Sequence, residues 1–286
     1  MQQDILLSSA IQSYSSGQFD QAERLFRQVL DLNPTEGQAL YFLGIIALSK
    51  GIADEACRLL YEATLSEPQN KDFSYSLAVA LQETSKLDEA LNRYLKIADM
   101  PEAQNNMGNI YRQTGELEKA SAAFDKAIQI NPKMVWAYVN KALLERQKGN
   151  QKQAEELLEK ALQIEPDFVQ ALYQLSVQNR LNNNFNKSLQ LIEKAIKINK
   201  NIDSVWVEYG KVLNALNRPE DALNAFEKAI ELKVFVRTLI SKKHLFWKRR
   251  ILILPKKNIG TFYELIRTTF RHITIWVPCF IVKIAL

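Results

Sequence analysis

The sequence predicts an all-α solenoid built from antiparallel helix pairs. Two columns of small residues predict it, because both recur at intervals of 34 residues and share one shorter interval of 30 residues. Two independent columns with the same shortened interval indicate an internal repeat. The first column is Ala10, Gly44, Ala78, Gly108, Ala142, Ser176 and Gly210, and the second is Ala22, Ala56, Ala90, Ala120, Ala154, Ser188 and Ala222.

Each repeat is predicted to contain two helices, because its apolar residues recur at helical spacing. The first helix should end at a residue type that tolerates left-handed backbone, and the second helix of four repeats should end before a proline. The predicted breaks are Gly17, Gly51, Ser85, Gly115, Gly149, Asn183 and Asn217, and the prolines are Pro34, Pro68, Pro132 and Pro166. Larger residues are predicted to pack beside the small ones, at Phe26, Leu60, Tyr94, Phe124, Leu158, Ile192 and Phe226.

A helix-turn-helix unit with this length and this order of small, large and proline positions resembles the tetratricopeptide repeat family. The resemblance implies a right-handed superhelical solenoid whose first helices line a concave groove. It covers residues 3–236, in units 3–36, 37–70, 71–100, 101–134, 135–168, 169–202 and 203–236.

The third, fifth and sixth units depart from the common pattern. The third is shortened, and Pro101 follows Met100 where the other units have a longer second helix and loop. The fifth and sixth carry polar residues at packing positions, including Glu145 and Asn179. These two units are predicted to be the least stable part of the array, because a stack loses cooperativity at a poor interface.

Charge divides the chain into two parts. Residues 237–286 hold eleven Lys or Arg and one acidic residue, so this segment carries a net +10 and residues 1–236 carry a net −5. A mildly acidic array lacks the clustered cations of a phosphate-binding surface, and we therefore expect no nucleic-acid partner. Cys57 and Cys279 indicate free thiols in a reducing compartment, and the first ten residues lack the pattern of a secretory signal. We expect a cytoplasmic protein, with membrane association as an alternative.

Two polar columns on the predicted first helices are the candidate binding residues. Side-chain amides both donate and accept hydrogen bonds, so a spaced series can hold the backbone of an extended peptide. This amide series is similar to the asparagine ladder of the O-linked N-acetylglucosamine transferase repeats. The amide column is Asn106, Asn140 and Gln174, followed by Glu208; the second column is Arg112, Arg146 and Arg180, and Asn105 and Asn109 lie beside them. The alternative is a solvated face whose arginines pair with nearby acids such as Glu116 or Glu145.

The first three units differ, because apolar and aromatic residues occupy their inner-face positions. They are Leu7, Ile11, Tyr14, Tyr41, Ile45, Leu48, Tyr75 and Val79. This stripe is suited to an apolar helix or peptide, and the alternative is packing within the array, which is favoured for the tyrosines.

The C-terminal segment has three alternative interpretations. Residues 236–254 place apolar side chains on one helical face and could cap the last unit before Pro255. Residues 256–286 combine basic, aromatic and apolar residues in a pattern suited to an anionic membrane surface, although the final apolar run is too short to predict a membrane span. The abrupt change of pattern would also result from a shifted reading frame or a truncated gene product.

Reaction chemistry is not expected. Both histidines lie in the C-terminal segment without ligand partners at metal-binding spacing, and the sequence holds no phosphate loop or nucleophile elbow. We therefore predict no catalytic residue, cofactor, metal or small-molecule substrate, and a non-enzymatic adaptor for a protein or peptide. The alternatives are a membrane-associated assembly factor, or the targeting arm of a sugar-, methyl- or sulfo-transferase whose catalytic domain is absent.

Overall fold

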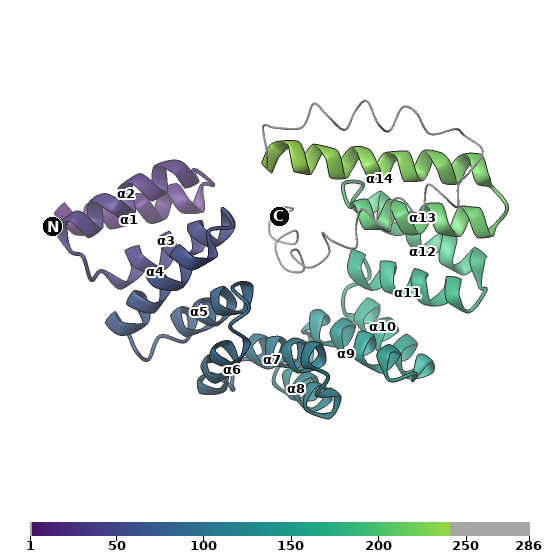
Figure 1. The fold of residues 1–286 in the computed structure, drawn as a ribbon, viewed down its shortest axis with the longest axis horizontal. Helices are drawn as coiled ribbons and strands as arrows, with labels where there is room; N and C mark the ends of the chain where they lie inside the picture. Colours follow the sequence, from purple (N-terminus) through teal and green to yellow (C-terminus); the bar gives the residue numbers. More distant parts are fainter. Residues whose placement is uncertain (1, 241–286) are drawn as a thin grey trace. The chain divides into compact units, whose positions relative to one another are not determined.

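The computed structural model describes the backbone of residues 2–240 and the side chains of residues 2–233. Throughout this range the only regular secondary structure is α-helix. The alternatives for residues 256–286 lie outside the described residues, as does most of the segment proposed to cap the last unit. The fourteen helices, drawn in Figure 1, are α1 (Gln2–Ser15), α2 (Phe19–Leu32), α3 (Gly37–Ser49), α4 (Ala53–Ser66), α5 (Lys71–Glu83), α6 (Leu87–Lys96), α7 (Pro101–Thr114), α8 (Leu117–Ile130), α9 (Val135–Gln147), α10 (Gln151–Ile164), α11 (Val169–Leu181), α12 (Phe185–Ile198), α13 (Asp203–Ala215) and α14 (Pro219–Ile240).

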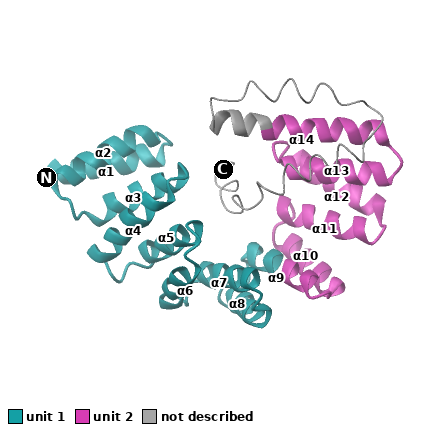
Figure 2. Ribbon diagram, viewed as in Figure 1, with its two compact units in different colours: residues 1–140 teal, residues 141–286 magenta. Residues whose placement is uncertain are grey.

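The chain divides into two compact units, which Figure 2 distinguishes by colour. Unit 1 spans residues 1–140 and unit 2 spans residues 141–286, so the division falls inside α9. In unit 1 the closest packing is between the two helices of a repeat, such as α3 with α4 and α7 with α8. In unit 2 the same holds for α11 with α12 and α13 with α14.

The short turns inside the helix pairs have left-handed backbone at all seven predicted positions. The four glycines there have φ between 74° and 87°, and Ser85, Asn183 and Asn217 have φ between 58° and 61°. The prediction of these breaks is confirmed. A residue with positive φ ends the first helix and lets the second helix return beside it.

The second helices end where the prolines predict. Helices α2, α4, α8 and α10 each end two residues before a proline, at Leu32, Ser66, Ile130 and Ile164. The shortened third unit shows its deletion in α6, which has 10 residues where the other second helices of unit 1 have 14. Proline stops the helix because it lacks a backbone N–H donor and clashes with the preceding turn.

The core of each pair is a small residue facing a large one. A Cβ atom added to Gly108 would lie 2.5 Å from the ring of Phe124, and one added to Gly210 would lie 2.6 Å from Phe226. Gly44 meets Leu60 in the same way, at 2.6 Å. Every member of the column of large residues is at most 3% exposed, which confirms that the small residues make room for the large ones.

In the sixth repeat, hydrogen bonding takes the place of part of this packing. The Ser176 hydroxyl donates to the Ser188 carbonyl at 3.0 Å, and the Ser188 hydroxyl donates to the Ser176 carbonyl at 2.8 Å. Both serines are fully buried, so this reciprocal pair satisfies the two hydroxyl groups that the sequence places at the helix crossing.

Candidate functional site

The eight residues selected from the sequence all lie on first helices. Four are on α7, two are on α9 and two are on α11. The division of the chain separates them, because Asn105, Asn106, Asn109, Arg112 and Asn140 belong to unit 1, whereas Arg146, Gln174 and Arg180 belong to unit 2.

In unit 1 the asparagines are hydrogen-bonded to one another. The Asn140 side-chain amide donates to Oδ1 of Asn105 at 2.9 Å, and Asn105 in turn donates to Oδ1 of Asn106 at 3.4 Å. Asn106 donates to the hydroxyl groups of Tyr75 at 3.1 Å and Tyr94 at 3.0 Å. This chain of bonds connects α9, α7, α5 and α6, so three of the four candidate amides have a structural role in joining neighbouring repeats.

The remaining two candidates of unit 1 lie further along α7. Asn109 is half-buried, and its side chain forms no hydrogen bond to any residue that the structure describes. Arg112 is also half-buried. Asn109 is thus the candidate amide of unit 1 whose side chain keeps its full hydrogen-bonding capacity.

In unit 2 the two candidate arginines each reach a polar residue of the following repeat. The Arg146 guanidinium donates from Nη1 to Oε1 of Gln174 at 3.1 Å. The Arg180 guanidinium donates from Nε to Oε1 of Glu208 at 2.5 Å. In both cases the partner is 28 residues further along the chain, so the arginine column of one repeat meets the amide column of the next.

Glu208 is the buried anion of this group. It is 1% exposed, and Nζ of Lys211 lies 3.6 Å from its second carboxylate oxygen. Tyr173 lies near the same charges; its burial, followed by the negative charge of Glu208, raises the pKa of its phenol to about 12. Burial likewise lowers the pKa of Arg146 from its usual value.

For Arg146 and Arg180, the two acids that the alternative interpretation named are not the partners. Glu116 pairs with Lys119, and Glu145 accepts a hydrogen bond from Asn150 at 2.7 Å and lies 3.7 Å from Lys148. Arg146 and Arg180 do not pair with these acids, because they reach across to the next repeat instead of along their own helix.

Two participants were missed by the sequence analysis. They are Tyr173, which directly precedes Gln174 of the amide column, and Lys211, which lies three residues after Glu208. Tyr75 was predicted to lie on the inner face, as part of the apolar stripe and not as a hydrogen-bond partner of Asn106. Alignment of the repeats could have found Tyr173, since Tyr41 and Tyr75 occupy the same position in earlier repeats.

Aromatic residues of the first three repeats pack against each other. The ring of Tyr14 lies 4.9 Å from that of Phe42, and the ring of Tyr41 stacks on Phe73 at 4.8 Å. These contacts favour packing within the array over an open apolar stripe.

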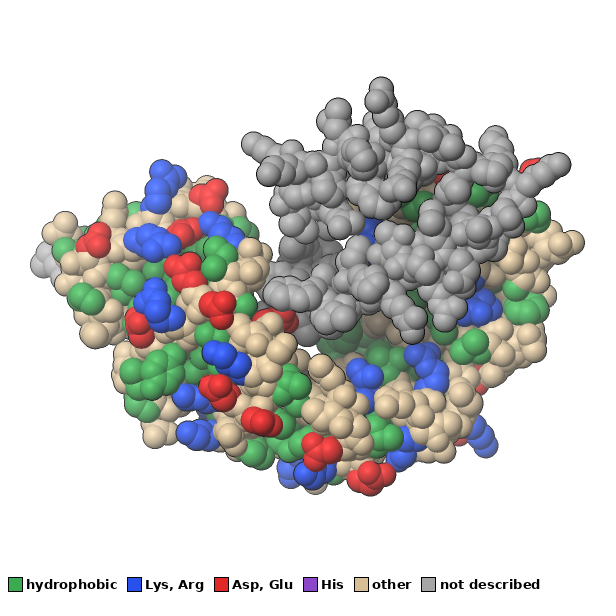
Figure 3. All heavy atoms as spheres, viewed as in Figure 1, with side chains coloured by type: hydrophobic (Ala, Val, Ile, Leu, Met, Phe, Trp, Pro, Cys, Tyr) green, Lys and Arg blue, Asp and Glu red, His purple; other side chains and the backbone are tan. Residues whose placement is uncertain are grey.

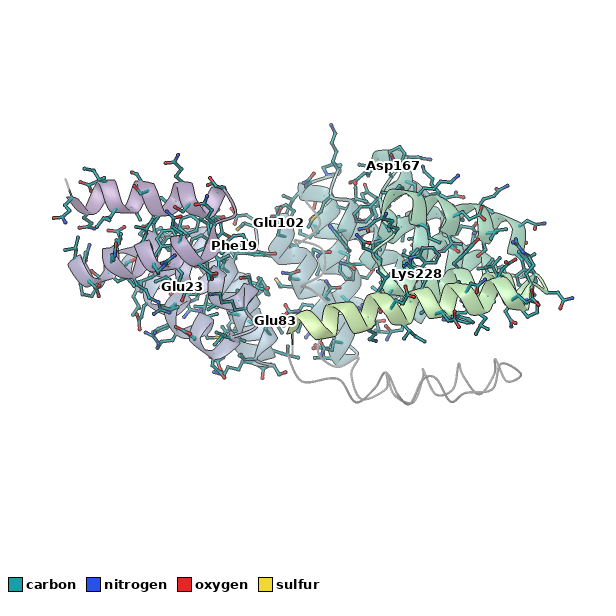
Figure 4. The ribbon with its side chains drawn as sticks, turned by 90° about the horizontal axis from the view of Figure 1, so that it is seen from above. Phe19, Glu23, Glu83, Glu102, Asp167 and Lys228 are labelled. Carbon is teal, nitrogen blue, oxygen red and sulfur yellow. The ribbon has the colours of Figure 1, made fainter. Side chains whose placement is uncertain are left out.

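Acidic residues of the second helices form surface ion pairs. Glu23, labelled on α2 in Figure 4, pairs with Arg27 at 2.9 Å and with Lys50 at 2.6 Å. In unit 2, Lys187 lies 3.1 Å from Glu155.

Over residues 2–233 no cluster of three or more His, Cys, Asp or Glu side chains is placed to hold a metal ion. In the described part of the chain, no helix combines the length and the apolar character needed to cross a membrane.

Comparison with known families identifies the repeat. The tetratricopeptide repeat profile matches residues 13–67 and 99–166, and the profile of anaphase-promoting complex, cyclosome, subunit 3 matches residues 147–229. Among solved structures, a tetratricopeptide repeat protein from Parabacteroides merdae has a TM-score of 0.67 at 22% identity, over 83% of this chain and 97% of that one. The likeness at this identity concerns the fold.

Curated relatives share a part of their length with this chain. Photosystem I assembly protein Ycf3 from Cyanophora paradoxa is 39% identical over 106 residues, which cover 32% of this chain and 61% of the relative. Protein FlbA from Caulobacter vibrioides is 28% identical over 138 residues, covering 46% and 23%. Cellulose synthase operon protein C from Komagataeibacter xylinus is 28% identical over 107 residues, covering 37% of this chain and 8% of the relative. The chain therefore spans less than two thirds of each of these relatives.

Proposed function

Because the chain is a tetratricopeptide-repeat protein, we propose that it acts as a non-catalytic scaffold that holds a segment of a partner protein on the face formed by its first helices. The tetratricopeptide fold is in general a protein-interaction scaffold. The observation that supports this face is the ordered polar surface of the first helices, where hydrogen bonds between consecutive repeats hold side chains in fixed positions.

The polar contacts to the partner are proposed to come from two places. In unit 1 they are the amides Asn106, Asn109 and Asn140, with Asn105 and Arg112 beside them; in unit 2 they are Arg146, Gln174 and Arg180. Asn140 uses its amide nitrogen on Asn105, which leaves Oδ1 of Asn140 as an acceptor for a backbone N–H of the partner. A side chain that is already ordered loses little conformational entropy when it binds.

A role in holding other proteins together is also consistent with the similarity to a relative that is named an assembly protein. That similarity covers 106 residues, so the partner of the relative is not carried over to this chain.

The proposal is tested by peptide selection on the full chain, followed by direct titration of the selected peptides. Alanine at both Asn106 and Asn140 should weaken binding by a few-fold to about tenfold, as expected for the loss of partly exposed hydrogen bonds. Alanine at Asn201, which is exposed in the loop before α13, is the matched control and should leave binding unchanged. Unchanged affinity in the double variant would reject the amide site, and failure to select any peptide would reject the scaffold proposal.

A further inference from the structure

Two arginines of unit 2 each keep one hydrogen-bonding edge that no side chain among residues 2–233 uses. A guanidinium group has an edge formed by Nε and Nη2 and an edge formed by Nη1 and Nη2, and either can bind a carboxylate through two parallel hydrogen bonds. Arg146 uses Nη1 for Gln174, and Arg180 uses Nε for Glu208. Among the described residues, these are the only side-chain partners of the two guanidinium groups.

The two remaining edges differ in their electrostatic surroundings. Arg146 is bonded to a neutral amide oxygen, so its positive charge is not matched by a directly bonded anion. Partial burial removes water from the Arg146 guanidinium, so its unmatched charge costs more free energy. The same desolvation lowers the pKa of Arg146. Arg180 is bonded through Nε to the carboxylate of Glu208, which is 1% exposed, whereas 22% of the Arg180 side chain is exposed. Neither Nη1 nor Nη2 of Arg180 is hydrogen-bonded to a described side chain, so this edge remains for a ligand.

Two further charged residues, Lys211 and Asp203, lie near this group. Lys211 adds a third cation 3.6 Å from Glu208, and Asp203 lies close enough to Tyr173 to affect the pKa of its phenol. Helix α11 itself carries no charged residue other than Arg180. On the face shown in Figure 3, Lys and Arg side chains gather over the region of α9 and α11, whereas acidic and basic side chains alternate over unit 1.

We propose that Arg146 and Arg180 form a receptor for an acidic peptide segment, in which each arginine binds one carboxylate of the partner through its unused edge. The two arginines occupy equivalent positions in consecutive repeats, so an extended segment lying along the first helices would present its acidic side chains to both. A carboxylate suits this place because its two oxygens match the two parallel N–H donors of an unused guanidinium edge. The inference rests on the proposed scaffold function and names the chemistry of the partner segment.

The test uses the full chain and a synthetic dodecapeptide that alternates Glu and Ser, compared with a copy in which every Glu is replaced by Gln. Both peptides are made with amidated C-termini, and a third version of the acidic peptide carries a free C-terminal carboxylate. The wild-type chain should bind the amidated acidic peptide at least about tenfold more tightly than the Gln copy at low salt, since charge-assisted bidentate pairs are stronger than neutral hydrogen bonds. If only the peptide with the free C-terminus binds, the carboxylate comes from the chain end and the two-carboxylate receptor is overturned.

Variants assign the preference to the two arginines. Arg146→Gln should reduce the acidic-to-neutral ratio several-fold, and Arg180→Lys should do the same while keeping a cation for the buried Glu208. The lysine is chosen because removal of the charge would take away the directly bonded cation of the buried Glu208, leave only Lys211 near it and disturb folding. Arg58→Gln, on the exposed surface of α4 beside Glu62, removes one positive charge from unit 1 and should leave the ratio unchanged.

The outcomes separate this inference from the scaffold proposal. Equal affinity for the acidic and Gln peptides, an unchanged ratio in both variants, or tighter binding of a phosphoserine version would overturn the acidic-peptide receptor. Peptides selected on the full chain that bind well but contain no acidic residues would also overturn it, while the scaffold function would stand. Loss of the ratio in Arg146→Gln and Arg180→Lys, with circular dichroism and melting temperature retained, would support it.

Discussion

Gln178 is a glutamine at a position that is apolar in the repeats on either side. It is 1% exposed, and the equivalent residues Leu144 and Val212 are fully buried. Within the described residues, neither its amide nitrogen nor its carbonyl oxygen has a hydrogen-bond partner. The neighbouring Asn179 is better satisfied, because its amide donates to the Leu175 carbonyl at 2.9 Å. A buried polar group without a partner costs free energy, so Gln178 is a weak point of α11.

Replacement of Gln178 by leucine should therefore stabilise the protein. We expect the free energy of unfolding to rise by about 1–3 kcal/mol, since the substitution removes two unsatisfied polar atoms at similar volume. Urea denaturation should show a higher midpoint with an unchanged slope. Gln147→Leu, at an exposed position near the end of α9, is the control and should have little effect. A lower midpoint for Gln178→Leu would mean that the amide is satisfied in solution.

Tyr173 should make the free energy of unfolding decrease as the pH rises in the alkaline range. Its folded-state pKa of about 12 lies above the ordinary value of 10.0. The stabilisation by the neutral phenol is therefore fully present below the unfolded pKa, and it is lost as the pH rises through the folded pKa. Between about pH 9 and pH 11.5 the wild type should lose about 2 kcal/mol more unfolding free energy than Tyr173→Phe. Equal losses in denaturant titrations would contradict the shift, and Tyr61→Phe, at a residue that is 48% exposed, is the control.

At the scale of helices, each pair depends on the contact between a small residue and a large one. In the second and fourth repeats the small residue is glycine, which has no Cβ atom and so leaves space for Leu60 in the second repeat and Phe124 in the fourth. The sixth repeat uses Ser176 instead and holds the crossing with reciprocal hydrogen bonds to Ser188. The same helix crossing is therefore stabilised in two chemically different ways within one chain.

Gly108→Ala separates this steric requirement from helix propensity. Propensity alone predicts stabilisation by about 1 kcal/mol, because alanine is the better helix former. The added Cβ would lie 2.5 Å from the Phe124 ring, so we expect destabilisation by about 1–3 kcal/mol instead. Thermal and urea denaturation decide between the two signs. Gln113→Ala, exposed on the same helix, is the control and should be near neutral, and an increase in stability for Gly108→Ala would contradict the close packing of α7 on α8.

At the scale of the whole molecule, contacts are made chiefly between neighbouring helices, and the chain divides into two compact units. In such an array each repeat is stabilised by its own helices and by the repeats beside it. Damage in one repeat should therefore remain local, in contrast to a single core in which the whole domain responds.

Hydrogen exchange on Gly108→Ala tests this locality. Amide exchange should accelerate in α7 and α8 and in the helices next to them within unit 1. Helices α13 and α14 of unit 2 should keep wild-type exchange rates, because each repeat of such an array is stabilised chiefly by its own helices and by the repeats beside it. The wild-type chain measured under the same conditions is the reference. Equal acceleration in both units would show that the array opens as one cooperative structure.

The sequence alone determined the helix pairs, their turns and their small-to-large packing, because these depend on local rules that every repeat obeys: left-handed turns at Gly, Asn or Ser, termination near proline, and small residues where helices cross. It also selected the first-helix polar columns. Only the tertiary structure decided what those side chains contact. Asn106 meets Tyr75 and Tyr94, and Arg180 meets Glu208 in the following repeat. The reason is physical. A periodic pattern fixes the face of the helix on which a side chain lies, whereas the partner of that side chain depends on how neighbouring repeats stack. Hydrogen bonds and ion pairs then form among the groups that this stacking brings together.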